Sequence, residues 1–266
     1  MKPSSLLLAT VLTVAGACAA SAQVKILHFA PDQIEDTYVG HDVVGGRENF
    51  NQGKLKEVRV GFQSSGQTFY YGLVGVKGLI GPSHVPPGAR IVKATLCGSF
   101  YVDDYSAAKG KIFVGRCLTD WLSYVTPGDA GPEGTGGAVE ADDKQNANYG
   151  PTFDAAFQYG GAWAGKAKDA EWRVPAGTPN DKRGFGTEDF TQDPEVPVQA
   201  DSWNSADKGR FTADVTALVQ AMAKEGKSCG FVFWAQDHGY AAFTSREFAS
   251  QGGFELEVSF SLADGK

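Results

Sequence analysis

The sequence predicts an all-β fold: a jelly-roll-like antiparallel β-sandwich with one short α-helix and a long loop excursion. Glycine supplies 34 of the 266 residues, nearly double its usual share of roughly 7%. Phe, Tyr and Trp number 17, 9 and 5, and aromatic residues favour strands. Short apolar runs alternate with turns rich in Gly and Pro, which is typical of sandwiches and barrels.

Residues 24–125 are expected to form a series of short strands. Their apolar residues either alternate with polar ones or form short runs between turn signals. Pro86-Pro87-Gly88 marks the clearest turn, directly before a run that begins at Arg90. The expected strands cover residues 36–39, 58–62, 69–76, 90–96 and 111–118.

The C-terminal part is expected to hold the single helix, which opens at residues 214–216. Either Thr212 or Asp214 supplies an oxygen to its first turn, and Gly226 suits its end. Lys224 complements the negative end of the helix dipole. One apolar stripe consists of Val215, Leu218, Val219 and Met222. Strands are expected at residues 209–211, 230–234 and 254–262, the last of them paired deep in its sheet.

Residues 1–22 are expected to be a signal peptide. Lys2 precedes an apolar run at residues 6–14, and Ala20-Ser21-Ala22 has the small-x-small form of a signal-peptidase site. The run is too short to cross the roughly 30 Å of a bilayer core. We therefore expect one mature domain, residues 23–266, secreted to the extracellular space, the cell surface or the periplasm without membrane insertion. Lipidation at Cys18 is the alternative.

A long Gly- and Pro-rich excursion spans residues 126–205 within this domain. It holds 14 acidic and 6 basic residues, which is the whole charge surplus of a mature chain with 31 acidic and 23 basic residues. Long loops of this kind are often functional. An acidic chain without a basic stripe argues against nucleic acid as a partner. The sequence does not specify the oligomeric state.

Three cysteines remain in the mature chain, namely Cys97, Cys117 and Cys229. Export permits disulfide bonds, but an odd count leaves at least one thiol unpaired. Cys97 and Cys117 are expected on neighbouring strands, where they either pair or stay reduced. No CxxC motif is present, so the sequence supports neither a zinc ribbon nor a redox motif.

No catalytic motif is found, so the chain is not expected to be an enzyme. The four histidines lack partners at metal-ligand spacing, and there is no HExxH or GxSxG motif. Two carboxylates about 5 to 10 Å apart would suffice for glycoside hydrolysis. The densest acidic pairs, Asp142-Asp143 and Glu188-Asp189, are interpreted as solvated loop charges, with catalysis as the alternative.

Aromatic residues in loops offer another chemistry, because sugar rings stack their CH faces on Tyr and Trp. Covering a strand edge or the core is the alternative role for such rings. Trp121 and Trp234 flank or occupy strands and are expected in the core. The aromatic residues expected in loops include Tyr105, Tyr159, Trp163 and Trp172.

A set of motifs follows in fixed order along nearly the whole mature chain. The strongest is a Pro-Pro-Gly-Ala-x-Ile-x-x-Ala-x-Leu pattern at residues 86–96. The motifs are Asp36-Thr37-Tyr38-Val39, Asn51-x-Gly53, Val60-Gly61, residues 86–96, Asp120-Trp121, Asp214-Val215-Thr216 and Phe243-x-Ser245-Arg246-Glu247. Together they resemble carbohydrate-binding module family 96, also described as DNRLRE-domain or disaggregatase-related modules.

The resemblance implies a jelly-roll-like sandwich that binds polysaccharide, often attached to larger secreted enzymes. Two departures stand out. Gly75, Val76 and Lys77 lie where the family has a basic residue followed by Phe-Asp. The excursion at residues 126–205 is also longer than is usual in the family.

Asp36 and Glu247 lie near strand ends at opposite ends of the chain, and the terminal strands of a sandwich often neighbour each other. We therefore expect the two acids to meet, with a salt bridge to Arg246 as the first interpretation. A shared calcium ion, which prefers several oxygen ligands, and direct ligand contact are the alternatives. Beyond this structural calcium, no cofactor is expected.

The leading hypothesis from the sequence is a secreted, non-catalytic protein that binds polysaccharide. Tyr105, Tyr159 and Trp163 are the expected stacking residues, and Arg246 is the expected polar contact. A structural or adhesive protein of the extracellular matrix or cell surface that binds another protein is one alternative. A polysaccharide hydrolase or lyase that uses acids or tyrosines of the excursion is the other.

Overall fold

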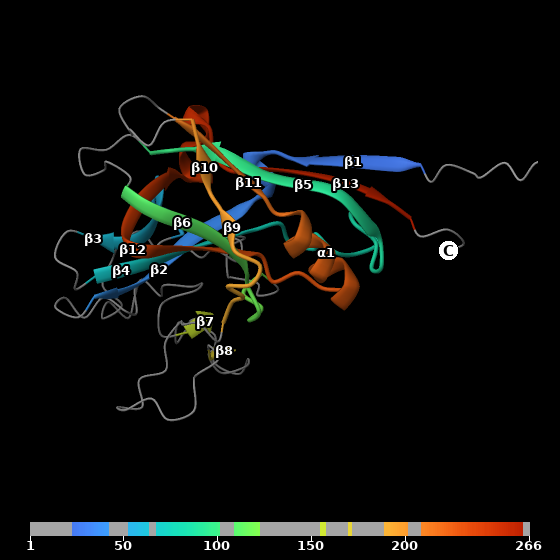
Figure 1. Ribbon diagram of the computed structural model, residues 1–266, viewed down its shortest axis with the longest axis horizontal. Helices are drawn as coiled ribbons and strands as arrows, with labels where there is room; N and C mark the ends of the chain where they lie inside the picture. Colours follow the sequence, from blue (N-terminus) through green and yellow to red (C-terminus); the bar gives the residue numbers. More distant parts are fainter. Residues whose placement is uncertain are drawn as a thin grey trace, which may run out of the picture.

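Two antiparallel β-sheets face each other in the computed structural model, which confirms the predicted all-β sandwich (Figure 1). Among the described residues, one α-helix lies beside them. The described part of the chain comprises residues 23–42, 53–63, 68–101, 109–122, 155–157, 170–171, 189–201 and 209–262.

The first sheet has five strands in the order β1-β13-β5-β11-β10. The C-terminal strand β13 lies between β1 and β5, as its alternating pattern predicted. The N-terminal strand β1 was not predicted. The bounds are β1 (Val24–Phe29), β13 (Glu255–Ser261), β5 (Arg90–Ser99), β11 (Arg210–Asp214) and β10 (Gln199–Ala200).

The second sheet has six strands in the order β2-β4-β3-β12-β6-β9. Its long strand β12 pairs with β4 through its first half and with β3 through its second half, so the sheet curls. The bounds are β2 (Glu35–Asp42), β4 (Thr68–Gly75), β3 (Glu57–Gln63), β12 (Phe231–Thr244), β6 (Lys109–Arg116) and β9 (Val196–Pro197). The remaining elements are β7 (Ala155–Phe157), β8 (Ala170–Glu171) and the 3-10 helices η1 (Pro31–Gln33) and η5 (Arg246–Gln251).

Phenylalanine rings fill the space between the two sheets. Phe211 of β11 lies 4.7 Å from Phe243 and 5.8 Å from Phe233, measured between ring centroids. Phe254 and Phe100 each pack against Phe243, at 5.9 and 5.3 Å. All five rings are almost completely buried, and aromatic contacts at these distances add to the burial of apolar area.

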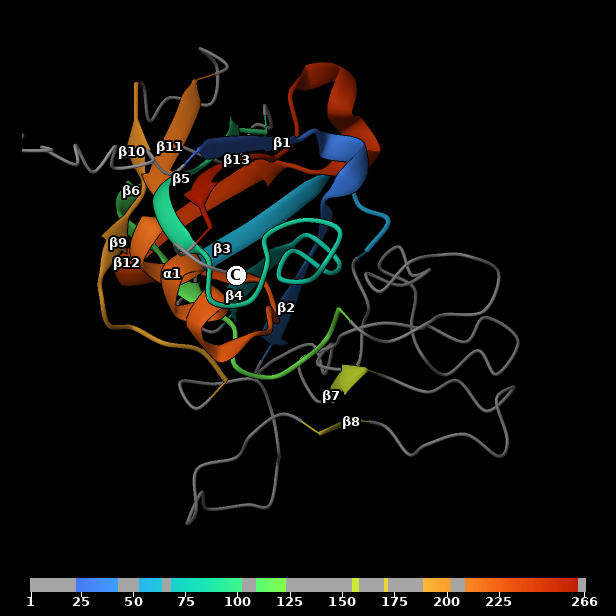
Figure 2. The same cartoon turned by 90° about the vertical axis from the view of Figure 1, so that its right-hand side faces the viewer.

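The helix α1 (Thr216–Glu225) lies beside β5 (Figure 2). Its apolar stripe is buried, as predicted. Asp214 rather than Thr212 serves its first turn, because the Asp214 carboxylate accepts the backbone N–H of Thr216 at 3.1 Å. Gly226 ends the helix in the left-handed conformation, with φ of 75°.

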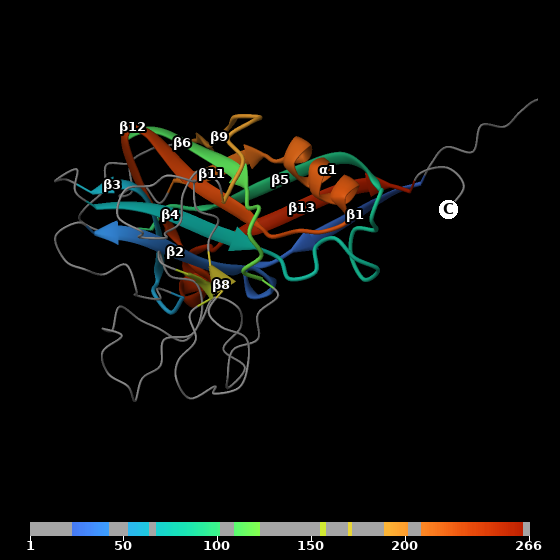
Figure 3. The ribbon, with the colours of Figure 1, turned by 90° about the horizontal axis from the view of Figure 1, so that it is seen from below.

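A second apolar cluster covers the outer face of the six-stranded sheet, where β2, β4, β12 and β6 lie side by side (Figure 3). Alternation along β4 explains the two clusters, because Leu73 faces the second cluster and Val74 faces the space between the sheets. Trp121 and Trp234 are buried as predicted, at 0% and 6% exposure, and both belong to this second cluster.

The expectation for the cysteines is wrong in one respect. Cys97 lies in β5 of the five-stranded sheet, whereas Cys117 directly follows β6 of the six-stranded sheet. The two residues are therefore not on neighbouring strands. None of the three is in a disulfide bond in the structure, and Cys117 and Cys229 are buried while Cys97 is partly exposed.

Among the described residues, no helix is long and apolar enough to cross a membrane. The predicted signal peptide at residues 1–22, including Cys18, lies outside the described residues. Most of the excursion at residues 126–205 lies outside them as well.

Candidate functional site

Six aromatic rings form an unbroken row on the outer face of the six-stranded sheet. From Phe62 to Phe69 the centroid distance is 5.9 Å, and from Phe69 to Tyr71 it is 5.5 Å. Phe190 continues the row at 5.6 Å from Tyr71 and 6.2 Å from Trp234. Trp234 then stacks on Phe113, its cross-strand neighbour, at 4.8 Å. We call Phe62, Phe69, Tyr71, Phe190, Trp234 and Phe113 the aromatic row.

Strand alternation and one bulge place these rings on the same face. Phe69 and Tyr71 are two residues apart on β4, so their side chains point the same way. Phe62 of β3 is directly opposite Phe69, which places both rings on one face of the sheet. Phe62 reaches this face because Gly61 interrupts the side-chain alternation of β3. Gly61 has φ of 91°, and a Cβ there would lie 1.9 Å from the Gly239 carbonyl oxygen. Only glycine fits this position.

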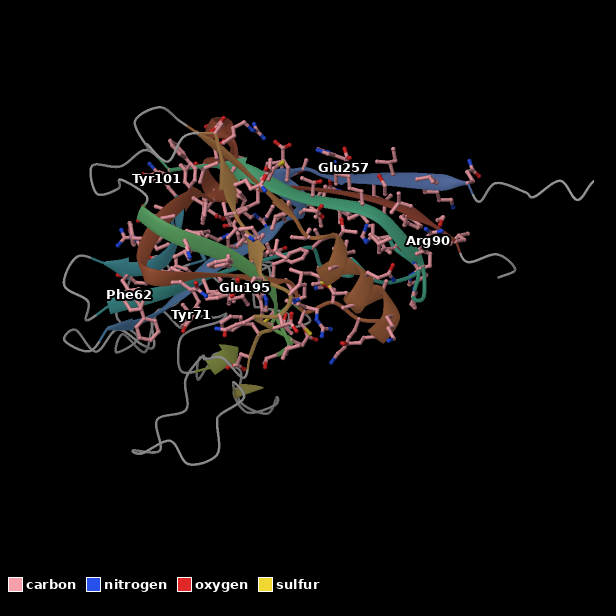
Figure 4. The ribbon with its side chains drawn as sticks, viewed as in Figure 1. Phe62, Tyr71, Arg90, Tyr101, Glu195 and Glu257 are labelled. Atoms are coloured by element: carbon pink, nitrogen blue, oxygen red, sulfur yellow. The ribbon has the colours of Figure 1, made fainter. Side chains whose placement is uncertain are left out.

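Exposure changes along the row. Phe62, Phe69 and Tyr71 are partly exposed, and the other three rings are buried. Figure 4 labels Phe62 and Tyr71 at the same end of the six-stranded sheet. Burial raises the pKa of the Tyr71 hydroxyl, which therefore remains a neutral donor and acceptor at physiological pH. The row thus combines a partly exposed end, whose successive rings are inclined by 41° and 87° to each other, with a buried, packed end.

Polar side chains follow the buried end of the row. Gln236 of β12 is opposite Lys111 of β6, one two-residue step beyond the paired Trp234 and Phe113. The Gln236 amide donates to the carboxylate of Glu195 at 3.5 Å, and Figure 4 shows Glu195 beside β9. Amide, ammonium and carboxylate groups next to aromatic rings can form hydrogen bonds that orient a bound ligand.

The indole of Trp234 adds an unusual feature to the row. Its Nε1 is buried and has no hydrogen-bond partner, and the same is true of Trp121 Nε1. Buried donors are rarely left unpaired in folded proteins. The face of the sheet under the row therefore holds two unpaired donors, one of them within the row itself.

Three of the four sequence-predicted ligand residues, Tyr105, Tyr159 and Trp163, lie outside the described residues. The fourth, Arg246, begins η5 beside β2. Its guanidinium pairs with Glu35, with Nη1 2.8 Å from Oε2. Its backbone N–H donates to Asp36 Oδ2 at 2.8 Å.

The structure brings Asp36 and Glu247 together around Arg246, but not through the predicted salt bridge to Asp36. Arg246 Nε lies 4.0 Å from Glu247 Oε1, and Lys54 Nζ lies 3.4 Å from the same oxygen. Asp36 is 1% exposed. Burial, and then the nearby Glu247 carboxylate, raise the pKa of Asp36 well above its usual value. Asp36 Oδ1 and Glu247 Oε2 are buried without a hydrogen-bond partner.

The cluster around Arg246 offers little to a metal ion. Within the described part of the chain, no three His, Cys, Asp or Glu side chains are grouped so that they could hold one. The positive charges of Arg246 and Lys54 already lie against Glu35 and Glu247. We therefore do not place the functional site here.

One acidic pair differs from its predicted environment. Glu188 and the pair Asp142-Asp143 lie outside the described residues. Asp189, interpreted from sequence as a solvated charge, is instead completely buried. It accepts a hydrogen bond from Thr119 Oγ1 at 2.8 Å, and its carbonyl oxygen accepts the N–H of Leu118 at 2.7 Å. Through this contact with Thr119, the Asp189 carboxylate holds the C-terminal part of the excursion against the end of β6.

Sequence reasoning missed the aromatic row. The signal was present, because Phe69 and Tyr71 are spaced by two residues in a predicted strand. Stacking residues were expected among the loop aromatics, and among the strand aromatics only Trp121 and Trp234 were assigned to the core.

A scan against models of known protein families and a search of curated proteins both return no match.

Proposed function

We propose that this protein is a non-catalytic polysaccharide-binding protein that holds sugar rings on the exposed end of the aromatic row. The observation that carries the proposal is the run of contacting rings from Phe62 through Phe69 to Tyr71, on one face of a sheet. Aromatic platforms bind the apolar CH faces of sugars with little loss of conformational entropy. Centroid spacings of 5.5–5.9 Å place three contacting rings within reach of one ligand, rather than one isolated ring.

The polar group at the other end of the row supports the same proposal. Gln236, Glu195 and Lys111 offer donors and acceptors to hydroxyl groups. A chain longer than one or two sugar residues would be needed to contact both ends. We therefore propose a polymer, not a monosaccharide, as the ligand.

Two features of the sequence agree with this proposal. The predicted signal peptide would deliver the protein to the compartments where polysaccharides occur. The resemblance to carbohydrate-binding module family 96 implies the same class of ligand. Both remain predictions. Recognition of another protein by the same exposed aromatic residues is the competing outcome that the experiment must separate.

A glycan array probed with the purified protein tests the proposal. We expect binding to one class of polysaccharide without the release of reducing ends over time. A stable fold that binds no glycan would contradict the proposal and favour a protein partner. Release of shorter products would instead show an enzyme.

Matched variants locate the binding surface. Tyr71→Ala is expected to weaken binding about fivefold, because a stacked ring contributes roughly 1 kcal/mol. Tyr101→Ala is the control, since Tyr101 is also a partly exposed tyrosine but contacts Phe248 of η5, outside the row. Equal losses in both variants would show that the row is not the binding surface.

A further inference from the structure

The described residues contain a pair of buried thiols that the proposed function does not use. Cys117 directly follows β6, and Cys229 comes two residues before β12. Both line one cavity of about 200 Å³ at the C-terminal end of α1, together with Arg116, Met222 and Lys227. Both also belong to the second apolar cluster. The two side chains therefore approach the same space from opposite strands.

Strand pairing brings the two backbones to the distance that a disulfide needs. The Cys117 N–H donates to the carbonyl oxygen of Gly230 at 2.9 Å, so Cys117 is paired with the residue next to Cys229. Directly opposite residues in an antiparallel pair have Cα atoms roughly 4.5–5.5 Å apart, and the next residue lies one step of about 3.4 Å further along the strand. The resulting separation of about 6 Å falls within the roughly 4.4–6.8 Å range for disulfides.

Gly230 explains why both thiols lie on the same side. Cys117 is opposite Gly230, and successive side chains of a regular strand point to opposite faces of the sheet. In a regular strand, Cys229 would therefore point to the face opposite to that of Cys117. Gly230 has φ of 85°, and a Cβ there would lie 2.8 Å from the Val74 carbonyl oxygen. This left-handed residue breaks the alternation just after Cys229. As a result, the thiols donate to carbonyl oxygens of consecutive residues, Cys229 to Leu118 and Cys117 to Thr119.

From this convergence we infer that Cys117 and Cys229 are a disulfide-forming pair, and that Cys97 is the thiol left over. Cys97 lies in the other sheet, where its sulfur is 4.0 Å from Glu255 Oε2 and from Arg210 Nη2. The bond would join the two strand ends at the base of the excursion, because Cys117 is also bridged to Phe190. It would enclose the whole excursion in one covalent loop.

The reaction requires an oxidant, for which a small-molecule disulfide such as oxidised glutathione suffices. One cysteine thiolate attacks the glutathione disulfide, forms a mixed disulfide and releases one glutathione thiolate. The second cysteine thiolate then attacks the protein-bound sulfur and releases the second glutathione. Two protons leave the protein, which is oxidised by two electrons while one glutathione disulfide is reduced to two thiols.

The bond is expected to form during folding rather than afterwards. Cys117 and Cys229 are only 2% and 4% exposed, and burial raises the pKa of Cys117 well above that of a free thiol. Few thiolates are therefore present or accessible once the sheet has closed. Oxidising the folded, reduced protein should be much slower than oxidative refolding.

Peptide mapping tests the inference on the unmutated protein. The reduced, unfolded chain is refolded with oxidised and reduced glutathione, remaining thiols are alkylated, and the digest is analysed by mass spectrometry. We expect Cys117 and Cys229 in one linked pair of peptides, with Cys97 alkylated. Linkage of Cys97 to either residue, or recovery of all three as alkylated thiols, would overturn the inference.

Variants add a second readout. Oxidation should raise the Tm on the order of 10 °C in the unmutated protein. The same rise is expected in Cys97→Ala, and none in Cys229→Ala. A metal ion bound in equal amounts to reduced Cys117 and Cys229, without a disulfide, would show a thiolate metal site and contradict the pairing. None of these outcomes depends on polysaccharide binding.

Discussion

At the scale of single residues, Asp36 shows how the fold tolerates a buried carboxyl group. The Arg246 N–H binds one of its oxygens, while Oδ1 and the nearby Glu247 Oε2 lack partners. Burial and the Glu247 charge both favour the protonated form. Because the folded state holds this proton more tightly than the unfolded chain, stability falls as the pH rises above the ordinary carboxyl pKa of 3.8.

Asp36→Asn is expected to flatten this pH dependence, because an amide has no proton to lose and its oxygen can still accept the Arg246 N–H. Urea unfolding between about pH 4 and pH 8 measures the effect. The unfolding free energy of the unmutated protein should fall more steeply with rising pH than that of the variant. Asp32→Asn, at an exposed carboxylate, is the control. Parallel curves for Asp36→Asn and the unmutated protein would refute the account.

Gly61 carries a second prediction at this scale. Gly61→Ala should destabilise the protein by about 2 kcal/mol or more, because the backbone is left-handed and the methyl group would overlap the Gly239 carbonyl. Gly78→Ala is the matched control, since Gly78 has φ of 68° but open space around it. Its cost should be limited to about 1 kcal/mol. Chemical denaturation compares the two, and equal costs would argue against the close approach at Gly61.

At the scale of elements, α1 takes the place of a strand along half of β5. β11 pairs with residues 95–99 of β5. Beyond that point the Gln220 side chain accepts the N–H of Ile91 at 2.9 Å and donates to the carbonyl of Ala89 at 3.1 Å. Thr216 Oγ1 accepts the N–H of Ala94 at 2.9 Å. Side chains of the helix therefore satisfy backbone N–H and carbonyl groups along this edge of β5.

Asp214→Ala tests how the first turn of this helix is held. The Asp214 carboxylate accepts both the backbone N–H and the hydroxyl of Thr216, which lowers its pKa. Its loss should cost about 1 kcal/mol of unfolding free energy. Asp214→Asn keeps an acceptor oxygen and should recover most of that loss. If both variants unfold at the same urea concentration as the unmutated protein, the contact does not hold the turn.

The elements show where sequence patterns succeed. β2 to β6, β11 and β13 were predicted, because alternation or a buried run is visible in each. β1 was missed because Val24 and Ile26 are exposed while Phe29 is buried, so its apolar residues point to both faces. The second half of β12 was missed because its pairing with β6 shifts between Gln236 and Tyr240. Irregular registers leave no simple period in the sequence.

At the scale of the whole molecule, the location of the candidate site could not be predicted. Phe69 and Tyr71 look like core residues in the sequence, and only the sheet topology shows that they face outwards beside Phe190. Phe190 comes from the excursion and reaches the row through its bridge to Cys117. Contacts between segments this far apart in sequence have no local signature. The acid cluster was predicted better, because its residues lie at recognisable strand ends.

The proposed disulfide acts at the same scale. It would close a loop on the order of 100 residues, for which the chain-entropy model gives about 5 kcal/mol of stabilisation. Reduction of the oxidised protein should lower the unfolding free energy by a similar amount, with unchanged polysaccharide affinity at temperatures where both forms are folded. Urea unfolding of both forms measures the first effect. A reduced form as stable as the oxidised form would contradict it.

The central claim is that polysaccharide contacts the exposed end of the aromatic row, and ring NMR signals test it most directly. With 13C-labelled Phe and Tyr rings, a bound oligosaccharide should shift the signals of Phe62, Phe69 and Tyr71 through its contact with their faces. The signal of Tyr101, outside the row, should stay in place. Saturating ligand that shifts Tyr101 while leaving the three row residues unchanged would contradict the account.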